Sequence, residues 1–358
     1  MPLANNPSQW SLFVVGCDRS GTTLLTSILE SGFGLAAPLE THVIPAFARG
    51  LWMWGDLERR AARRRLLVAM IDFLEILIAR TYPTKSVEAL EPVTLLAVRD
   101  RIDAMVDESR DFGDLILGWF GRFANSHGQT GWVDNSSFYE SLPLEIWEAH
   151  LPQMRVIHIV RDGRDVALSW LKSWWGPATL GEAAWLWRRH VRDKRAWGLK
   201  HPGYYLEISY ESLLTRPEEN VARIAAFLNL PVPSWPVDLT LSASARALSS
   251  GGTHDLLRGP VKSDNREKWR TALSDRDQRL FEWFAADLLR ASGYPTRFDP
   301  MSVIERLLLA PQAILSLGKR FFTPVFYAKK AKWVIPWILR LAGSTRGLVV
   351  RLAMGRKG

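Results

Sequence analysis

Residues 16–23 give the clearest indication of a binding or catalytic site in the chain. They read Gly-Cys-Asp-Arg-Ser-Gly-Thr-Thr. An apolar run precedes this segment and an amphipathic pattern follows it, which predicts a strand, a tight turn and the start of a helix. Gly16 and Gly21 permit the turn. The N–H groups at the helix start and the positive end of its dipole attract an anion. This first anion segment therefore predicts a site for a phosphate-like group.

The first anion segment differs from the phosphate loop of nucleoside triphosphatases, which ends in Gly-Lys followed by Ser or Thr. Thr22 occupies the position of that lysine, and the positive charge lies earlier, on Arg19. The lysine contacts terminal phosphates and the following hydroxyl holds Mg²⁺ in such loops. Its absence argues against a triphosphate site of that kind.

A second anion segment, residues 155–169, reads Arg-Val-Ile-His-Ile-Val-Arg-Asp-Gly-Arg-Asp-Val-Ala-Leu-Ser. The pattern predicts a strand that ends at Arg161 and a helix that begins near Asp162. Arg161 can bind a phosphate through two hydrogen bonds, and Ser169 follows about two helical turns later. The segment therefore predicts a further anion site.

Strands and helices alternate along the chain. Short apolar runs predict buried strands at residues 11–15, 131–133, 155–160 and 204–208. Helical patterns occupy residues 24–30, 142–150, 165–174, 182–197 and 218–228. The alternation predicts an α/β fold with an open parallel sheet wound by crossover helices.

A helical insertion, about residues 43–125, separates the first two predicted strands, with helical patterns at 58–80, 86–107 and 112–124. We expect it to cover the carboxyl edge of the sheet, where open α/β folds bind ligands. A loop-like stretch at 234–262 precedes a helical pattern at 275–291. Residues 1–300 are predicted to form the main domain and residues 301–358 a helical basic tail.

Charge is distributed unevenly over the 358 residues. The whole chain has a net charge of +9, with 46 Lys or Arg and 37 Asp or Glu. Residues 301–358 hold 11 of the basic residues and one acidic residue, which leaves 35 basic and 36 acidic residues before them. The body is therefore nearly neutral, and the tail carries about +10.

The tail mixes cations with aromatic and aliphatic side chains, which favours contact with a membrane surface through residues 311–358. A helical appendage packed on the body is the alternative. The longest uncharged stretch of the tail is too short for a spanning helix, and the apolar content of the tail makes nucleic acid an unfavoured partner.

The N-terminus lacks a secretory signal pattern and Cys17 is the single cysteine, so a cytoplasmic location is expected, with peripheral membrane contact through the tail. Nothing in the sequence indicates the oligomeric state.

The two anion segments together resemble a known family. Gly-x-x-Arg-Ser-Gly-Thr-Thr-Leu-Leu, followed later by Val-Arg-Asp-Gly-Arg-Asp-Val-x-x-Ser, is similar to the nucleotide-binding signatures of sulfotransferases that use 3'-phosphoadenosine 5'-phosphosulfate (PAPS). The likeness continues through Ser-Tyr-Glu-Ser-Leu-Leu-x-x-Pro-Glu from residue 209 to the Gly293-Tyr294 pair, so it covers roughly residues 11–296. It implies a P-loop-like nucleotide-binding core and transfer of a sulfuryl group to a hydroxyl or amine.

The resemblance also implies residue roles. The first anion segment would bind the 5'-phosphosulfate through Arg19, Ser20, Gly21, Thr22 and Thr23. Arg161 and Ser169 would hold the 3'-phosphate. The residues that would close over the nucleotide or lie near it are Tyr210, Arg258, Lys262 and Lys268. A sulfuryl group carries less charge than a terminal phosphoryl group, so these donors are expected to suffice without a metal ion.

A general base is required because the attacking hydroxyl must lose its proton. Residues 38–45, Pro-Leu-Glu-Thr-His-Val-Ile-Pro, are similar to the Glu-Thr-Arg-Val-Ile-Pro segment of the tyrosylprotein sulfotransferase branch, whose glutamate is the base. That likeness assigns the base to Glu40. His42 is the competing candidate, because other branches use a histidine. Arg19 is expected to neutralise the negative charge of the reacting phosphosulfate.

The chain departs from that branch at two places. A transition-state lysine in Lys-Asp-Pro-Phe corresponds to Asn135 here, which brings a hydrogen-bond donor without charge. A later serine corresponds to Thr253, with Ser249 and Ser250 as alternatives. The acceptor therefore stays open among a glycan, a lipid-linked and a tyrosine-like group.

Two other functions compete with the sulfotransferase. The first is a P-loop nucleotide or small-molecule kinase, which predicts a lysine before Thr23 and magnesium ligands. The second is a non-enzymatic membrane-associated nucleotide-binding module.

Overall fold

A computed structural model describes residues 11–82, 84–136, 143–173, 176–239, 242, 265–319, 335–336 and 338–341. Its centre is a five-stranded sheet in the order β2-β3-β1-β4-β5, with all neighbouring strands parallel. The strands are β1 (Ser11–Gly16), β2 (Leu35–Ala36), β3 (Gly131–Asp134), β4 (Met154–Val160) and β5 (Tyr205–Ser209). The predicted α/β fold with a parallel sheet is confirmed. The sequence prediction lacks β2, because a strand of two residues has no periodic pattern.

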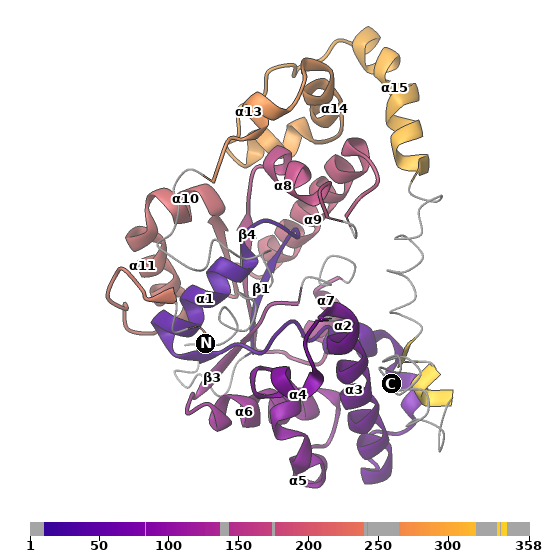
Figure 1. Cartoon of the computed structure of the whole chain (residues 1–358), viewed down its shortest axis with the longest axis vertical. Helices are drawn as coiled ribbons and strands as arrows, with labels where there is room; N and C mark the ends of the chain where they lie inside the picture. The colour runs from indigo at the N-terminus through magenta and orange to yellow at the C-terminus, as the bar shows by residue number, and fades with distance from the viewer. Residues whose placement is uncertain are drawn as a thin grey trace.

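The central strands β1 and β4 bring the two anion segments to one edge of the sheet. They pair from Ser11 opposite Met154 to Gly16 opposite Ile159. Because parallel strands end at the same edge, the turns that follow them are neighbours. Helix α1 (Thr22–Phe33) follows the turn after β1, and α8 (Gly163–Trp170) follows β4 (Figure 1).

Alternate residues of β1 face the two sides of the sheet, as its pleat requires. Leu12 and Val14 pack with α1 and with the helices after β5, α10 (Tyr210–Thr215) and α11 (Pro217–Leu228). Phe13 and Val15 pack in the large core that the insertion fills. Helix α9 (Leu180–Lys200) contacts α8 and contributes to the third core, with Val160 at the end of β4. Each face of the sheet is therefore covered.

The insertion is helical, as predicted. Its elements are α2 (Val43–Phe47), η2 (Ala48–Trp54), α3 (Arg60–Thr81), α4 (Val87–Leu90), η3 (Glu91–Val93), η4 (Leu95–Arg101), α5 (Ile102–Glu108) and α6 (Phe112–Ser126), where η marks a 3₁₀ helix. Fully buried aromatic side chains, Phe73, Trp119 and Phe120, join it to Trp132 of β3. This core fixes the insertion against the sheet.

The prediction of one helix over residues 86–107 is wrong. Pro92 falls in the middle of this stretch, and Thr94 has the extended angles φ −129° and ψ 165°. Thr94 Oγ1 accepts a hydrogen bond from Leu96 N, so the chain restarts there as η4. The prediction over 142–150 is also too long, because α7 covers Glu145–Glu148 only. The sequence prediction lacks α10, which Ser209 caps directly after β5.

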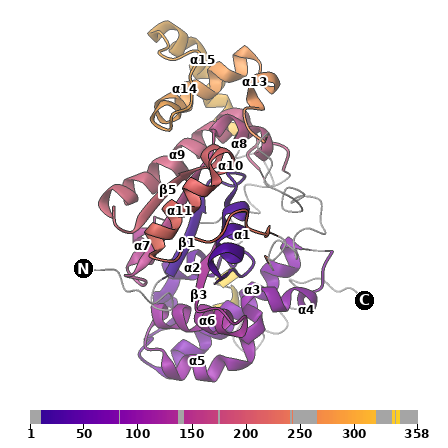
Figure 2. The ribbon, with the colours of Figure 1, turned by 90° about the vertical axis from the view of Figure 1, so that its left-hand side faces the viewer.

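The chain then forms α13 (Trp269–Ala272), α14 (Asp275–Ala291) and α15 (Val303–Gly318). Helix α14 has the predicted bounds. Figure 2 shows α13, α14 and α15 at one end of the molecule and the insertion helices α3, α5 and α6 at the other. Within the described part of the chain, no helix combines the length and the apolar character needed to cross a membrane.

Candidate functional site

The first anion segment forms the predicted tight turn. Ser20 N donates to Cys17 O at 3.0 Å, and Gly21, with φ 96°, precedes the first residue of α1. A Cβ atom on Gly21 would lie 2.4 Å from the ring of Tyr210, and one on Gly16 would lie 2.7 Å from Ile159 O. Glycine is therefore required at both positions, because a side chain would clash with a neighbouring group. Gly21 also has a left-handed backbone conformation, which favours glycine.

The start of α1 has the properties of an anion site. No side chain caps its N-terminus, and its first turn holds no acidic residue. The Ser20 hydroxyl is buried and has no hydrogen-bond partner among the described residues. Main-chain N–H groups, a buried hydroxyl and the positive end of the helix dipole together favour a bound anion. Thr22 and Thr23 occupy the first two positions of the helix, which begins two residues before the predicted start at residue 24.

The two anion segments meet through their arginines. Arg19 Nε donates to Ser169 Oγ at 3.0 Å, and Arg161 Nη1 donates to Arg19 O at 3.2 Å. Arg161 also lies with its guanidinium carbon 4.5 Å from the centre of the Tyr210 ring. The structure thus brings together four residues that the sequence analysis placed in one site, from segments up to 190 residues apart in the chain.

A residue that the sequence analysis missed completes this cluster. Asn265 accepts a hydrogen bond from Arg161 Nη2 through its carbonyl oxygen at 3.0 Å, and its side-chain amide donates to Tyr210 Oη at 2.8 Å. Trp187 Nε1 holds the carbonyl oxygen of Arg161 from the other side, at 3.0 Å. Asn265 follows a loop-like stretch with no periodic pattern, so only the tertiary contact identifies it.

Two neighbouring arginines, Arg161 buried and Arg19 partly buried, bring positive charge to this site, where Arg161 Nη2 also lies 3.7 Å from Asp165 Oδ2. Burial lowers the pKa of Arg19 from its usual value, and the neighbouring Arg161 acts in the same direction, while Asp18 and Glu40 oppose them. Arg161 is 6% exposed, and its Nε has no hydrogen-bond partner among the described residues. An anion between the two guanidinium groups would relieve their repulsion and their desolvation.

Glu40 and His42 lie next to each other beside this cluster. His42 Nε2 is 3.4 Å from Glu40 Oε2, the Glu40 side chain is 35% exposed and the His42 side chain 7%. His42 has the left-handed φ of 50° and precedes α2. Because Glu40 contributes to the pKa of Arg19, the carboxylate lies within electrostatic reach of the first anion segment. Both candidate bases are therefore positioned at the same site.

The end of β3 anchors the loop that carries Glu40. Ser136 Oγ accepts hydrogen bonds from Thr41 N and His42 N, both at 3.0 Å, and donates to Asp134 Oδ1 at 2.9 Å. Thr41 Oγ1 donates to Asp134 Oδ2 at 3.3 Å. Between these anchors, Asn135 is 7% exposed, and its Oδ1 has no hydrogen-bond partner among the described residues.

The remaining predicted residues fall in two groups. Lys268 is exposed immediately before α13, and the next residue, Trp269, donates its N–H to Asp165 Oδ1 at 2.9 Å. Arg258 and Lys262 lie outside the described residues, and so do Ser249, Ser250 and Thr253. Among the described residues, no group of three or more His, Cys, Asp or Glu side chains is arranged to hold a metal ion.

Comparisons with known proteins identify a family and a fold for this chain. A family model described as the sulfotransferase family matches residues 11–234. The sulfotransferase domain of the Synechococcus PCC 7002 olefin synthase is 23% identical, with a TM-score of 0.50 over 78% of this chain and 95% of that domain. The sulfotransferase domain from the curacin biosynthetic pathway is 18% identical, with a TM-score of 0.51 over 80% of this chain and 99% of that domain.

These two structural similarities concern the fold. A comparison with curated protein sequences found no match. The family model spans more than half of the chain and includes β1 to β5, both anion segments and the Glu40 loop. The chain therefore belongs to the sulfotransferase family.

Proposed function

We propose that this protein transfers a sulfuryl group from PAPS to a hydroxyl or amine of an acceptor. One observation carries the choice of donor: Arg19 and Ser169 are hydrogen-bonded at the carboxyl edge of the sheet, with Arg161 against both the Arg19 carbonyl and Tyr210. Two anion sites that share a wall fit a nucleotide with phosphate groups at its 5' and 3' positions.

In this proposal the first anion segment binds the 5'-phosphosulfate. The donors are Arg19, Ser20, the main-chain N–H of Gly21, Thr22 and Thr23. Arg161 and Ser169 bind the 3'-phosphate, and Tyr210 contacts the nucleotide. Arg258, Lys262 and Lys268 are proposed to close the site. The support is the buried Ser20 hydroxyl, the Arg161 Nε that has no hydrogen-bond partner among the described residues, and the contact between the two arginines.

The transfer is a displacement at sulfur. The acceptor oxygen or nitrogen forms a bond to sulfur while the bond between sulfur and the bridging phosphate oxygen breaks, and 3'-phosphoadenosine 5'-phosphate (PAP) leaves. Glu40 accepts the proton of the acceptor. Arg19 stabilises the negative charge that develops on the leaving phosphate. His42, 3.4 Å from Glu40, orients that carboxylate and is the alternative base.

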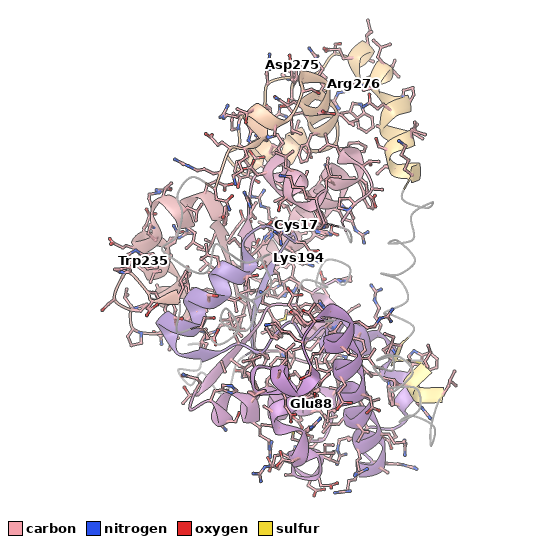
Figure 3. All side chains as sticks on the ribbon, viewed as in Figure 1. Cys17, Glu88, Lys194, Trp235, Asp275 and Arg276 are labelled. Carbon is pink, nitrogen blue, oxygen red and sulfur yellow. The ribbon has the colours of Figure 1, made fainter. Side chains whose placement is uncertain are left out.

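The decisive experiment follows labelled sulfate from PAPS into hydroxyl and amine acceptors, with PAP binding measured by calorimetry. Glu40→Gln is expected to lower the transfer rate by about 10²- to 10⁴-fold while PAP binding persists, because a neutral amide cannot accept the proton. Glu88, an exposed carboxylate of α4 that Figure 3 labels, provides the control variant Glu88→Gln, which should be fully active. A chain that does not bind PAP would refute the proposal.

His42→Gln separates the two candidate bases. If Glu40 is the base, this variant should lose about tenfold in rate, less than Glu40→Gln loses, because only the orientation of the carboxylate changes. The opposite ranking of the two variants would assign the base to His42. Transfer of phosphate from ATP in the presence of Mg²⁺, without transfer from PAPS, would instead favour the kinase.

A further inference from the structure

Helix α15 exposes its apolar residues to solvent. Six large aliphatic side chains are between 62% and 75% exposed: Val303, Ile304, Leu307, Leu308, Ile314 and Leu315. Their spacing, including steps of one, three and four residues with exposed Pro311 between them, places all of them on one side of a helix of 3.6 residues per turn. They form a continuous row, which we call the α15 stripe.

The opposite side of α15 contacts the rest of the protein through several polar groups and a few apolar ones. Glu305 Oε1 accepts a hydrogen bond from Arg279 of α14 at 2.9 Å, and Gln312 Oε1 accepts from Arg276 of α14 at 3.1 Å. Ser316 is buried, and its carbonyl oxygen accepts from Thr179 Oγ1 at 2.9 Å. Figure 3 labels Arg276 beside α15. Ala313 is also buried in the third core on this side, and Leu317 packs against that core, so both polar and apolar groups attach α15 to the rest of the protein.

This arrangement is the reverse of that in a surface helix of a water-soluble domain, which buries its apolar side. A capping box between Ser302 and Glu305 starts the helix, so its conformation does not depend on covering the stripe. A continuous exposed apolar row of this kind marks an interaction surface. The contacts to α14 and α9 orient α15 so that the stripe faces away from the rest of the protein.

The charge pattern identifies the covering surface as lipid. Residues 306–358 contain 11 Lys or Arg and no Asp or Glu. The last acidic residue, Glu305, is paired with Arg279. Arg306, exposed and 3.5 Å from Asp299 through its Nη2, lies within the residue range of the stripe, and exposed Lys319 follows the stripe. Aliphatic side chains on one side with an excess of nearby cations fit an anionic membrane surface, where acyl chains cover the stripe and lipid headgroups neutralise the cations.

We propose that α15 lies in the plane of an anionic membrane surface, with the α15 stripe in the boundary between headgroups and acyl chains. The proposal does not depend on the sulfotransferase reaction. It assigns membrane contact to residues 303–319, and so begins before the range 311–358 that the tail composition favours.

Binding of the full chain to vesicles tests the proposal. Vesicles of phosphatidylcholine mixed with phosphatidylserine should bind the protein, and vesicles of phosphatidylcholine alone should bind it much more weakly. The variant with Leu307→Ser, Leu308→Ser, Ile314→Ser and Leu315→Ser should bind the mixed vesicles at least about tenfold more weakly, because it lacks four aliphatic side chains that would enter the lipid. Leu199 and Val232, 84% and 62% exposed, provide the matched control variant Leu199→Ser with Val232→Ser, which should bind like the wild type.

A probe on the stripe reports the environment directly. Cys17 is the single cysteine of the chain and is 1% exposed, so a Leu308→Cys variant can be labelled at one site with an environment-sensitive fluorophore. Its emission should shift to shorter wavelength when mixed vesicles are added, and that of a labelled Leu199→Cys variant should not. The substituted side chains are exposed, so each variant should keep its fold. PAP binding by each variant checks this.

Three results would overturn the proposal. The four-site variant could bind mixed vesicles as tightly as the wild type, in which case another part of the chain binds lipid. The label at position 308 could stay unshifted while the protein binds vesicles. The shift could instead occur without vesicles and grow with protein concentration, in which case a second copy of the chain covers the stripe.

Discussion

At the scale of single residues, the two arginines Arg19 and Arg161 define the site. Hydrogen bonds fix both side chains. Arg19 donates to the Ser169 hydroxyl, and Arg161 donates to the carbonyl oxygens of Arg19 and Asn265. Such restraint removes side-chain freedom before a ligand arrives, which lowers the entropic cost of binding. Arginine also offers paired donors that match a phosphate, which lysine does not.

Arg161→Lys should therefore weaken PAP binding about tenfold or more although the charge is kept, because the two-point hydrogen bonding is lost. Calorimetry measures the effect. Arg155→Lys is the matched control: Arg155 lies on β4, the strand that directly precedes Arg161, is also buried, and donates to the carbonyl oxygens of Phe227 and Leu228 at the far end of β4. This control should lose stability but bind PAP normally, and equal loss of PAP binding in both variants would contradict the assignment.

At the scale of elements, the turn between β1 and α1 depends on Gly21. Its φ of 96° and its closeness to Tyr210 exclude a side chain for two separate reasons. Gly21→Ala should destabilise the fold by about 1–3 kcal/mol, and should weaken PAP binding, because either the turn or the Tyr210 ring must move. Urea unfolding measures the first effect.

Gly128→Ala isolates the contribution of the backbone. Gly128 has φ 69°, and a Cβ atom there would meet nothing within 4 Å. This variant should show a smaller loss of stability and unchanged PAP binding. Equal losses of stability in Gly21→Ala and Gly128→Ala would mean that the contact with Tyr210 contributes little.

A buried hydrogen-bonded chain links β4 to β5. His158, fully buried, has its Nδ1 2.6 Å from Tyr205 Oη, and Tyr205 donates in turn to Glu207 at 3.0 Å. Burial lowers the pKa of His158, with Glu207 opposing and Lys194 and Arg195 adding to the decrease. Burial alone would raise the pKa of Glu207, but the hydrogen bonds from Arg195 and the nearby His158, 3.6 Å away, hold it well below its usual range.

The sign of the pH effect follows from these directions. As pH falls below the unfolded histidine value, about 6.5, the unfolded chain takes up a proton that folded His158 resists, so the free energy of unfolding decreases. His158→Gln should therefore show a smaller decrease between pH 7 and pH 5 than the wild type, measured by urea unfolding at each pH. A wild-type slope in His158→Gln would contradict this account of the buried histidine.

At the scale of the whole molecule, the proposed donor site joins parts of the protein that are distant in sequence. The first anion segment, α8, α10 and Asn265, which lies between α11 and α13, all contribute to it. A ligand that binds only the folded chain stabilises the molecule by about 2.7 kcal/mol at a concentration 100 times its dissociation constant. PAP should therefore raise the melting temperature of the full chain.

AMP, which lacks the 3'-phosphate, should raise the melting temperature much less than PAP at equal concentration. The difference between the two ligands should disappear in Arg161→Ala, because that variant loses the proposed 3'-phosphate contact. Thermal unfolding of both proteins with both ligands measures this. Equal stabilisation of the wild type by AMP and PAP would remove the support for a 3'-phosphate site.

Much of the fold and part of the candidate site could be predicted from the sequence, for local physical reasons. The apolar run and Gly16 and Gly21 encode β1, its turn and the start of α1 within one segment. The strand that ends at Arg161 is equally local. The break at Pro92 and Thr94 was missed because the helical pattern of the apolar residues continues through it. The two-residue strand β2 was missed because it forms only by pairing with β3.

The sequence by itself determined the parallel α/β architecture, the two anion segments and the family resemblance, because each depends on residue types at short spacing. Only the tertiary structure decided which residues share a wall of the site, because the contacts among Arg19, Arg161 and Asn265 cross more than one hundred residues. It alone also showed that α15 turns its apolar side to solvent. Amphipathic spacing predicts that a helix has an apolar side, but the contacts to α14 and α9 decide which way that side faces.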